Sequence, residues 1–118
     1  MTVAEDLVGR GYVDDAAFAR HWVTTRAARG YGAARLRAEL WARGVAPALV
    51  DRALGTLDPG DQLEEARRLA RRRLPALRRA EPRKAGARLR DHLRRRGFAG
   101  DVVAQVVRES LRLPAEGD

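Results

Sequence analysis

Apolar side chains recur along this chain at spacings of three and four residues, which is the period of an α-helix. In the first half the pattern predicts helices at about 14–29, 33–43 and 47–57, and Gly30 and Gly44 are placed to end the first two. The apolar positions on these helices are Phe18, Trp22, Leu36, Leu40, Leu49, Val50, Ala53, Leu54 and Leu57. No segment has the strict apolar and polar alternation of a strand, so we expect an all-α fold.

The second half follows the same order of one long and two shorter helices. The long helix opens at Asp61 with a pattern like a capping box, and we expect Pro75 to end or kink it near Arg73. Two further helices are predicted at about 83–96 and 101–113. The apolar positions in this half are Leu63, Ala66, Leu69, Ala70, Leu74, Leu89, Leu93, Val102, Val103, Val106, Val107 and Leu111.

The start of the chain has the pattern of the last turns of another helix. Residues 4–9 have helical character, Arg10 and Gly11 are typical of a helix end, and Asp14 or Asp15 can cap the next helix. We therefore expect four parts, which are the tail of an incomplete first repeat (1–12), a three-helix repeat (13–58), a strongly basic three-helix repeat (59–113) and a flexible tail (114–118).

The two predicted repeats share sequence as well as helix order. Residues 34–54 and 87–107 are identical at 9 of 21 positions with a constant offset of 53. Duplicated helical units that stack on one another form elongated arrays. We therefore expect tandem three-helix repeats in an elongated, curved array, which offers a partner an extended surface rather than an enclosed pocket.

Composition narrows the classes of function. The chain has no cysteine, which excludes disulfides, thiolate catalysis and cysteine-ligated zinc. The only histidines are His21 and His92 and the only serine is Ser110, and no phosphate-cradling Gly-rich loop is present. We expect neither an enzyme nor a cofactor or metal site. Without a long apolar run or a signal-peptide pattern, we expect a cytoplasmic protein that does not bind membranes.

Charge gives the clearest indication of a binding role. Of the 24 basic residues that give the chain its net charge of +8, only Lys84 is a lysine. Residues 67–96 contain 14 basic groups against Glu81 and Asp91 alone. Such a segment attracts polyanions or an acidic protein face, although a GC-rich genome would also favour arginine over lysine. For His92, which lies among arginines, an ordinary solvated role is favoured over a phosphate contact.

Arginine side chains opposite the apolar faces are the candidate partner-binding residues. Because Leu36, Leu40, Leu89 and Leu93 occupy the inward faces of the short helices, the neighbouring arginines should point outward. The candidates are Arg20, Arg26, Arg29, Arg35, Arg37, Arg67, Arg71, Arg78, Arg88, Arg90, Arg94 and Arg95.

Residues 11–20 and 26–45 resemble the signature of the bacterial RecX regulatory proteins. The shared features are Gly-Tyr-Val-Asp-Asp from Gly11, Phe-Ala from Phe18, Arg-Gly-Tyr-Gly from Arg29 and an Arg-rich helix that ends in Arg-Gly at Gly44. The basic segment before Phe98 is similar to the closing repeat of that family. Ala33 stands where the family commonly has proline. The resemblance covers about residues 5–110.

The resemblance implies a regulatory protein that binds the RecA recombinase filament in its helical groove. There it would inhibit or modulate RecA ATPase, strand exchange and co-protease activity in recombination, DNA repair and the SOS response. It also implies scaffold roles for Tyr12, Asp14, Asp15, Phe18 and the Tyr31-Gly32 turn. We expect a monomer. The alternative is a protein that binds single- or double-stranded DNA directly, if weakly, through the basic surface of residues 67–96.

Overall fold

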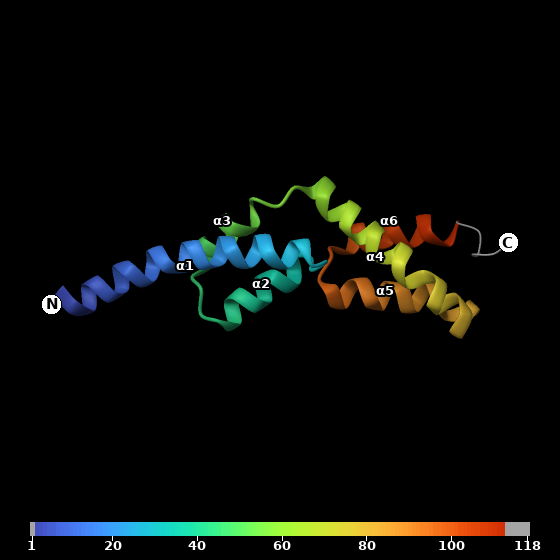
Figure 1. Ribbon diagram of the computed structural model, residues 1–118, viewed down its shortest axis with the longest axis horizontal. Coiled ribbons are helices and arrows are strands. Elements are labelled where there is room, and N and C mark those ends of the chain that lie inside the picture. Colours follow the sequence, from blue (N-terminus) through green and yellow to red (C-terminus); the bar gives the residue numbers. More distant parts are fainter. Residues whose placement is uncertain (1, 113–118) are drawn as a thin grey trace.

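The structure is a computed structural model that describes the backbone of residues 2–112 and the side chains of residues 14–112. All regular structure in this range is helical (Figure 1). The helices are α1 (Thr2–Ala28), α2 (Ala33–Ala42), α3 (Pro47–Leu54), α4 (Pro59–Ala80), the short 3-10 helix η1 (Pro82–Lys84), α5 (Ala85–Arg96) and α6 (Gly100–Leu111). The predicted all-α fold of tandem three-helix repeats is confirmed.

The two repeats lie end to end. Helices α1 to α3 form one bundle and α4 to α6 form the other, with the two termini at opposite ends of the molecule (Figure 1). The molecule measures 70 × 23 × 20 Å along its principal axes. The predicted elongated arrangement is therefore present.

Each bundle has its own hydrophobic core. The first core contains Ala19, Val23, Leu36, Leu40, Val45, Leu49, Val50, Ala53 and Leu54. The second contains Ala66, Leu69, Ala70, Leu74, Ala85, Leu89, Leu93, Phe98, Val103, Val106 and Val107. Leu36 and Leu40 are fully buried, as are the repeat-equivalent Leu89 and Leu93, because residues four apart lie on one helix face.

The expected helix boundary at Arg10 and Gly11 is wrong, because α1 runs without interruption from Thr2 to Ala28. Asp14 and Asp15 consequently lie inside a helix and cap nothing. Glycine lowers helix propensity by about 1 kcal/mol relative to alanine, but it does not forbid the conformation. The proposed tail at 114–118 lies outside the described residues.

Helix α4 also differs from its predicted limits. It is capped by Asp58, not by Asp61, and the Asp58 carboxylate accepts hydrogen bonds from the backbone N–H groups of Gly60 (2.6 Å) and Asp61 (3.3 Å). The helix does not end near Arg73 but continues through Pro75 to Ala80. Buried Leu74 and partly buried Leu77 pack against the second core on either side of Pro75. This packing offsets the proline penalty of about 3 kcal/mol.

Two of the apolar positions expected to face a core are exposed, namely Phe18 (37%) on α1 and Leu111 on α6. Leu111, at the end of α6, is 50% exposed, while Val103, Val106 and Val107 on the same helix are buried as expected. Leu111 lies over Gly86 of α5, which has no side chain to cover it. By contrast, the helix-ending glycines Gly30, Gly44 and Gly97 have φ values of 90°, 82° and 96°, the left-handed conformation expected of such residues.

Candidate partner-binding surface

Half of the predicted partner-binding arginines are engaged within the protein. Arg26 and Arg35 pair with Glu39, Arg37 with Asp51, and both Arg67 and Arg88 with glutamates of the second repeat. The guanidinium of Arg78 donates to the Ser110 carbonyl oxygen at 3.1 Å. Each ion pair among the described residues joins groups of the same repeat, so none of these pairs links the two repeats.

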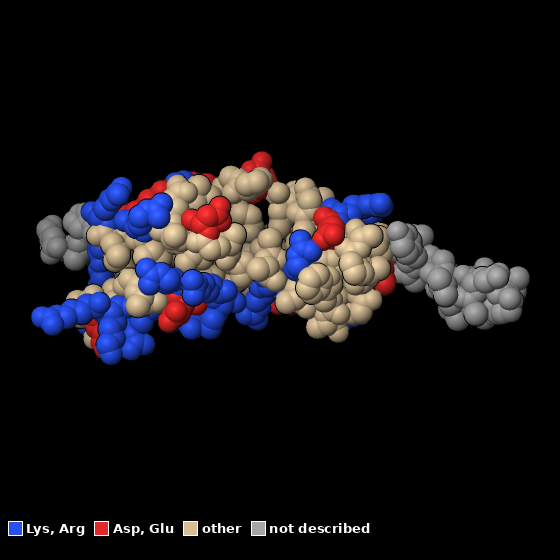
Figure 2. All heavy atoms as spheres, turned by 180° about the vertical axis from the view of Figure 1, so that it is seen from behind, with Lys and Arg blue, Asp and Glu red and all other residues tan. Residues whose placement is uncertain are grey.

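The other half are exposed and carry no ion pair or side-chain hydrogen bond within residues 14–112. They are Arg20, Arg29, Arg71, Arg90, Arg94 and Arg95. Figure 2 shows that Lys and Arg side chains gather over the repeat formed by α4 to α6, while the repeat formed by α1 to α3 presents broader uncharged areas. These six arginines are therefore the predicted partner-binding residues that a partner can contact without breaking an ion pair.

Glu39 organises the arginines of the first repeat. Its carboxylate accepts two hydrogen bonds of 2.7 Å from Arg26, one of 3.1 Å from Arg35 and one of 2.9 Å from the indole N–H of Trp22. Burial opposes ionisation of Glu39, but these hydrogen bonds outweigh it and lower its pKa. Arg26 and Arg35 are thereby held on one side of α2.

Tyr31 lies between cations from three helices. The guanidinium carbons of Arg26, Arg35 and Arg96 lie 4.2, 5.0 and 4.5 Å from the centre of its ring. These distances are within the range of cation–π attraction. Because Arg96 belongs to α5, the Tyr31 ring contacts both repeats.

The backbones of the two repeats meet directly beside this ring. The N–H of Gly32 donates to the carbonyl oxygen of Arg96 (2.7 Å), and that of Ala34 donates to the carbonyl oxygen of Gly97 (3.0 Å). A Cβ at Gly97 would lie 2.3 Å from the Cβ of Arg35, and a Cβ at Gly32 would lie 2.4 Å from the backbone of Gly97. We call Tyr31, Gly32, Arg35, Arg96 and Gly97 the inter-repeat joint.

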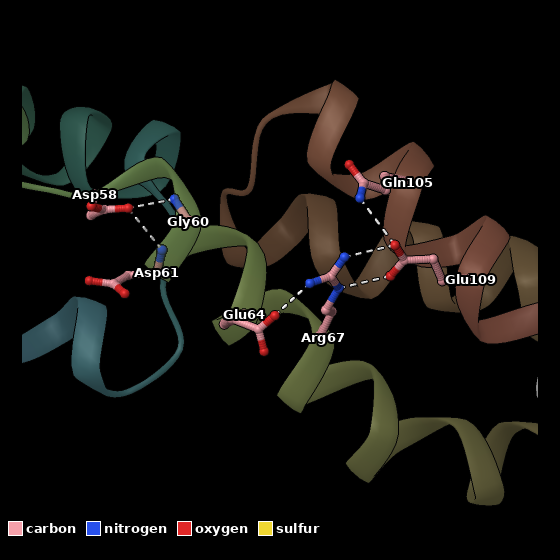
Figure 3. A network of polar contacts seen from close by, with 7 residues as sticks. All are labelled: Asp58, Gly60, Asp61, Glu64, Arg67, Gln105 and Glu109. Atoms are coloured by element: carbon pink, nitrogen blue, oxygen red, sulfur yellow. Dashed lines mark hydrogen bonds and ion pairs between the residues drawn. The ribbon is translucent and has the colours of Figure 1, made fainter.

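In the second repeat, Arg67 joins α4 to α6 (Figure 3). It donates two hydrogen bonds of 2.8 Å to the Glu109 carboxylate and a third to Glu64, while Gln105 donates to Glu109 at 3.0 Å. These contacts, that from Arg67 above all, lower the pKa of Glu109 to about 2. A partner that bound Arg67 would have to replace them.

Sequence reasoning missed several residues of this surface. Trp41 is 52% exposed, with the Arg37 guanidinium 5.6 Å from its ring centre, and Arg43 lies 4.2 Å from the Trp22 ring centre. The repeat alignment held the signal, since Trp41 corresponds to Arg94 of the second repeat and so occupies an outward position. Glu39 is replaced by His92 at the equivalent position, so the second repeat has no carboxylate at this point of its short helix.

His92 is half-buried rather than simply solvated. It lines a small pocket between α4 and α5 together with Arg73, which was absent from the predicted set. Burial lowers the pKa of His92, and the positive charges of Arg73, Arg96 and Arg95 lower it further. Within residues 2–112, no helix is long and apolar enough to cross a membrane. Among the side chains of residues 14–112, no three His, Asp or Glu residues group together as metal ligands.

Comparison with known proteins gives consistent matches to one family. The family model of the second three-helix domain of RecX matches residues 14–54, and that of the third matches residues 60–107. The chain is 43% identical to the regulatory protein RecX of Thermobifida fusca over 91% of its own length and 57% of the relative. It is 36% identical to that of Streptomyces coelicolor over 96% of its own length and 63% of the relative.

A third relative, the regulatory protein RecX of Xanthomonas campestris, is 39% identical over 91% of this chain and 65% of its own length. The chain thus spans about three-fifths of the length of these curated relatives. No solved structure matches it.

Proposed function

This chain belongs to the RecX family of regulatory proteins, and from that membership we propose that it acts by binding the RecA recombinase filament. We propose further that it lies in the helical groove of the filament and inhibits or modulates RecA ATPase, strand exchange and co-protease activity. It would do so without catalysis of its own. Recombination, DNA repair and the SOS response are the processes that such a regulator would affect.

The exposed, unpaired arginines on an elongated array are the observation that supports this proposal most directly. A protein 70 Å long and about 20 Å wide is narrow enough to lie along a groove of a larger partner. It is too thin to enclose a large ligand. Free guanidinium groups suit carboxylates on an acidic protein face, because their planar fork binds carboxylate oxygens in pairs. Arg20 and Arg29 in α1 and the turn after it, and Arg90 and Arg94 in α5, supply such groups on both repeats.

The test is RecA-dependent ATP hydrolysis on single-stranded DNA with the chain present at substoichiometric amounts. We expect inhibition that persists when bare DNA is added in excess. Inhibition that excess DNA removes would instead favour simple competition for DNA and would contradict the proposal.

Charge reversal then locates the contact. The double variants R20E/R29E and R90E/R94E change free arginines of the first and second repeat, so neither breaks an ion pair of the described residues. Loss of inhibition in one variant, with an unchanged melting temperature, assigns the RecA contact to that repeat. If both variants inhibit like the unmodified protein, these arginines do not form the contact.

Direct DNA binding is the second candidate function, and the charge of the second repeat favours it. Residues 67–96 carry 14 basic groups, enough to neutralise several phosphates. Each phosphate contact on duplex DNA contributes a slope of about −0.9 to a plot of log affinity against log salt concentration. A steep slope together with weak RecA inhibition would support this function over the first.

A further inference from the structure

The second repeat has a small cationic pocket between α4 and α5. Its lining consists of Arg73, Leu77, Arg88, Asp91, His92 and Arg95, and its volume is about 110 Å³. Pockets that enclose metabolites or cofactors usually measure about 300–1,000 Å³. A volume this small fits one compact ionic group.

The charge of the lining selects an anion. Three guanidinium groups face the pocket against one carboxylate, that of Asp91. Arg73 and Arg95 are exposed and have no ion pair within the described residues, while Arg88 is paired with Glu81 at 2.5 Å. Two of the three guanidinium groups therefore have donors that no carboxylate occupies.

We propose that this pocket binds a backbone phosphate of duplex DNA, held by Arg73 and Arg95 with His92 as a neutral hydrogen-bond donor. A phosphodiester presents two anionic oxygens, which match two forked guanidinium groups. The pocket lies within the basic segment, so the surrounding arginines can contact neighbouring phosphates of the same strand. The proposal rests on the DNA-binding candidate function and is independent of RecA.

His92 reports the occupancy of the pocket. The charged groups that face it are Arg73 from α4 and Arg88, Asp91, Arg95 and Arg96 from its own helix. In the free protein, burial and the arginines hold its pKa below the ordinary value of about 6.5. A bound phosphate offsets the arginine charges, so the pKa of His92 should rise on binding.

The first experiment follows both histidines by NMR as a function of pH, with and without a short duplex DNA. We expect the pKa of His92 to rise toward its ordinary value when DNA is present. The ring signals of His21, which is exposed on α1 of the other repeat, are recorded in the same spectra as an internal reference. A second sample receives inorganic phosphate at the same phosphate concentration. An unchanged His92, or a rise with inorganic phosphate but none with duplex DNA, would overturn the proposal.

The second experiment compares two variants of equal charge. R73A/R95A removes two pocket arginines, whereas R108A/R112A removes two exposed arginines of the same repeat, one in the last turn of α6 and one directly after that helix. We expect R73A/R95A to lose at least tenfold in duplex affinity at low salt and to reduce the salt slope by about 0.9, because the one phosphate contact that both arginines hold disappears. The logarithm of the duplex affinity should fall less than half as much for R108A/R112A as for R73A/R95A.

Equal losses in the two variants would show that duplex DNA binds the basic repeat without using the pocket. That outcome would overturn the pocket assignment while leaving DNA binding intact. If the unmodified protein does not bind duplex DNA, both the phosphate site in the pocket and the DNA-binding function are overturned. Melting temperatures of the variants, measured alongside, show that the comparison is made between folded proteins.

Discussion

At the scale of single residues, arginines of identical charge have three different environments in this protein. Arg26 and Arg67 are fixed by forked hydrogen bonds to Glu39 and Glu109, Arg96 lies against the Tyr31 ring, and Arg90 is exposed without a partner in the described part of the chain. An exposed arginine can contact a partner at little cost. A paired one first has to give up its carboxylate, which opposes binding.

Glu109 gives a prediction about pH. Its pKa of about 2 in the folded protein lies below the value of about 4.3 expected in the unfolded chain. The stabilisation from its ionised form is therefore complete above about pH 4.3 and is lost as the pH falls toward 2. We expect E109Q to have a lower urea midpoint than the unmodified protein at pH 7, and the difference should shrink as the pH is lowered to about 2. A difference that stays constant with pH would contradict the role given to the Arg67–Glu109 pair.

At the scale of elements, α4 shows how packing overrides a local signal. Pro75 lacks the N–H that would reach the carbonyl of Arg71 four residues earlier, and its ring crowds the same group. The helix nevertheless continues to Ala80, because Leu74 and Leu77 on either side of Pro75 contact the second core. A local helix breaker inside a strongly amphipathic segment thus leaves the helix intact.

The corresponding prediction is that P75A stabilises the protein. Alanine restores the backbone hydrogen bond and removes the crowding, so we expect a gain of about 1–3 kcal/mol in the free energy of unfolding, measured by urea titration. P59A is the matched control, since Pro59 occupies the first turn of the same helix, where proline is favoured. No gain is expected there. A larger gain from P59A than from P75A would contradict the explanation.

At the scale of the whole molecule, two separate cores are joined at the inter-repeat joint, beside which the Ala33 N–H also donates to the Gln62 side chain of α4 (3.1 Å). The Cα radius of gyration is 18.2 Å, whereas a compact domain of 118 residues would have about 13.5 Å. The long shape depends on the close backbone approach at Gly32 and Gly97, since each core is confined to its own repeat.

Gly97 and Gly44 give a matched test of this joint. Both glycines end the second helix of their repeat with a left-handed φ, but Gly97 presses against Arg35 and a Cβ at Gly44 would meet nothing within 4 Å. Both G97A and G44A should lose about 1–2 kcal/mol from backbone strain. Only G97A should also change the small-angle X-ray scattering curve, because the Arg35 backbone must move and the repeats reorient. Identical curves for the two variants would show that the joint tolerates a side chain.

Most helices and both repeats could be predicted from the sequence, because the patterns that indicate them are local. The spacing of Leu36 and Leu40, the glycines after α2 and α5, and the repeat between residues 34–54 and 87–107 all act within a few helical turns or by direct comparison. The boundaries that failed, at Gly11, Asp61 and Pro75, depend on the balance between local propensity and packing across helices. That balance cannot be read from one segment alone.

The sequence by itself determined that this is a basic, all-α protein of tandem three-helix repeats, because helical periodicity, helix-ending glycines and charge are properties of the chain. Only the tertiary structure decided which arginines are free. Arg67 and Glu109 are 42 positions apart, and Arg35 and Gly97 are 62 apart, so their contacts arise only when helices distant in sequence pack together. The His92 pocket likewise exists because the packing of α4 against α5 brings Arg73 and Arg95 to the lining of one pocket.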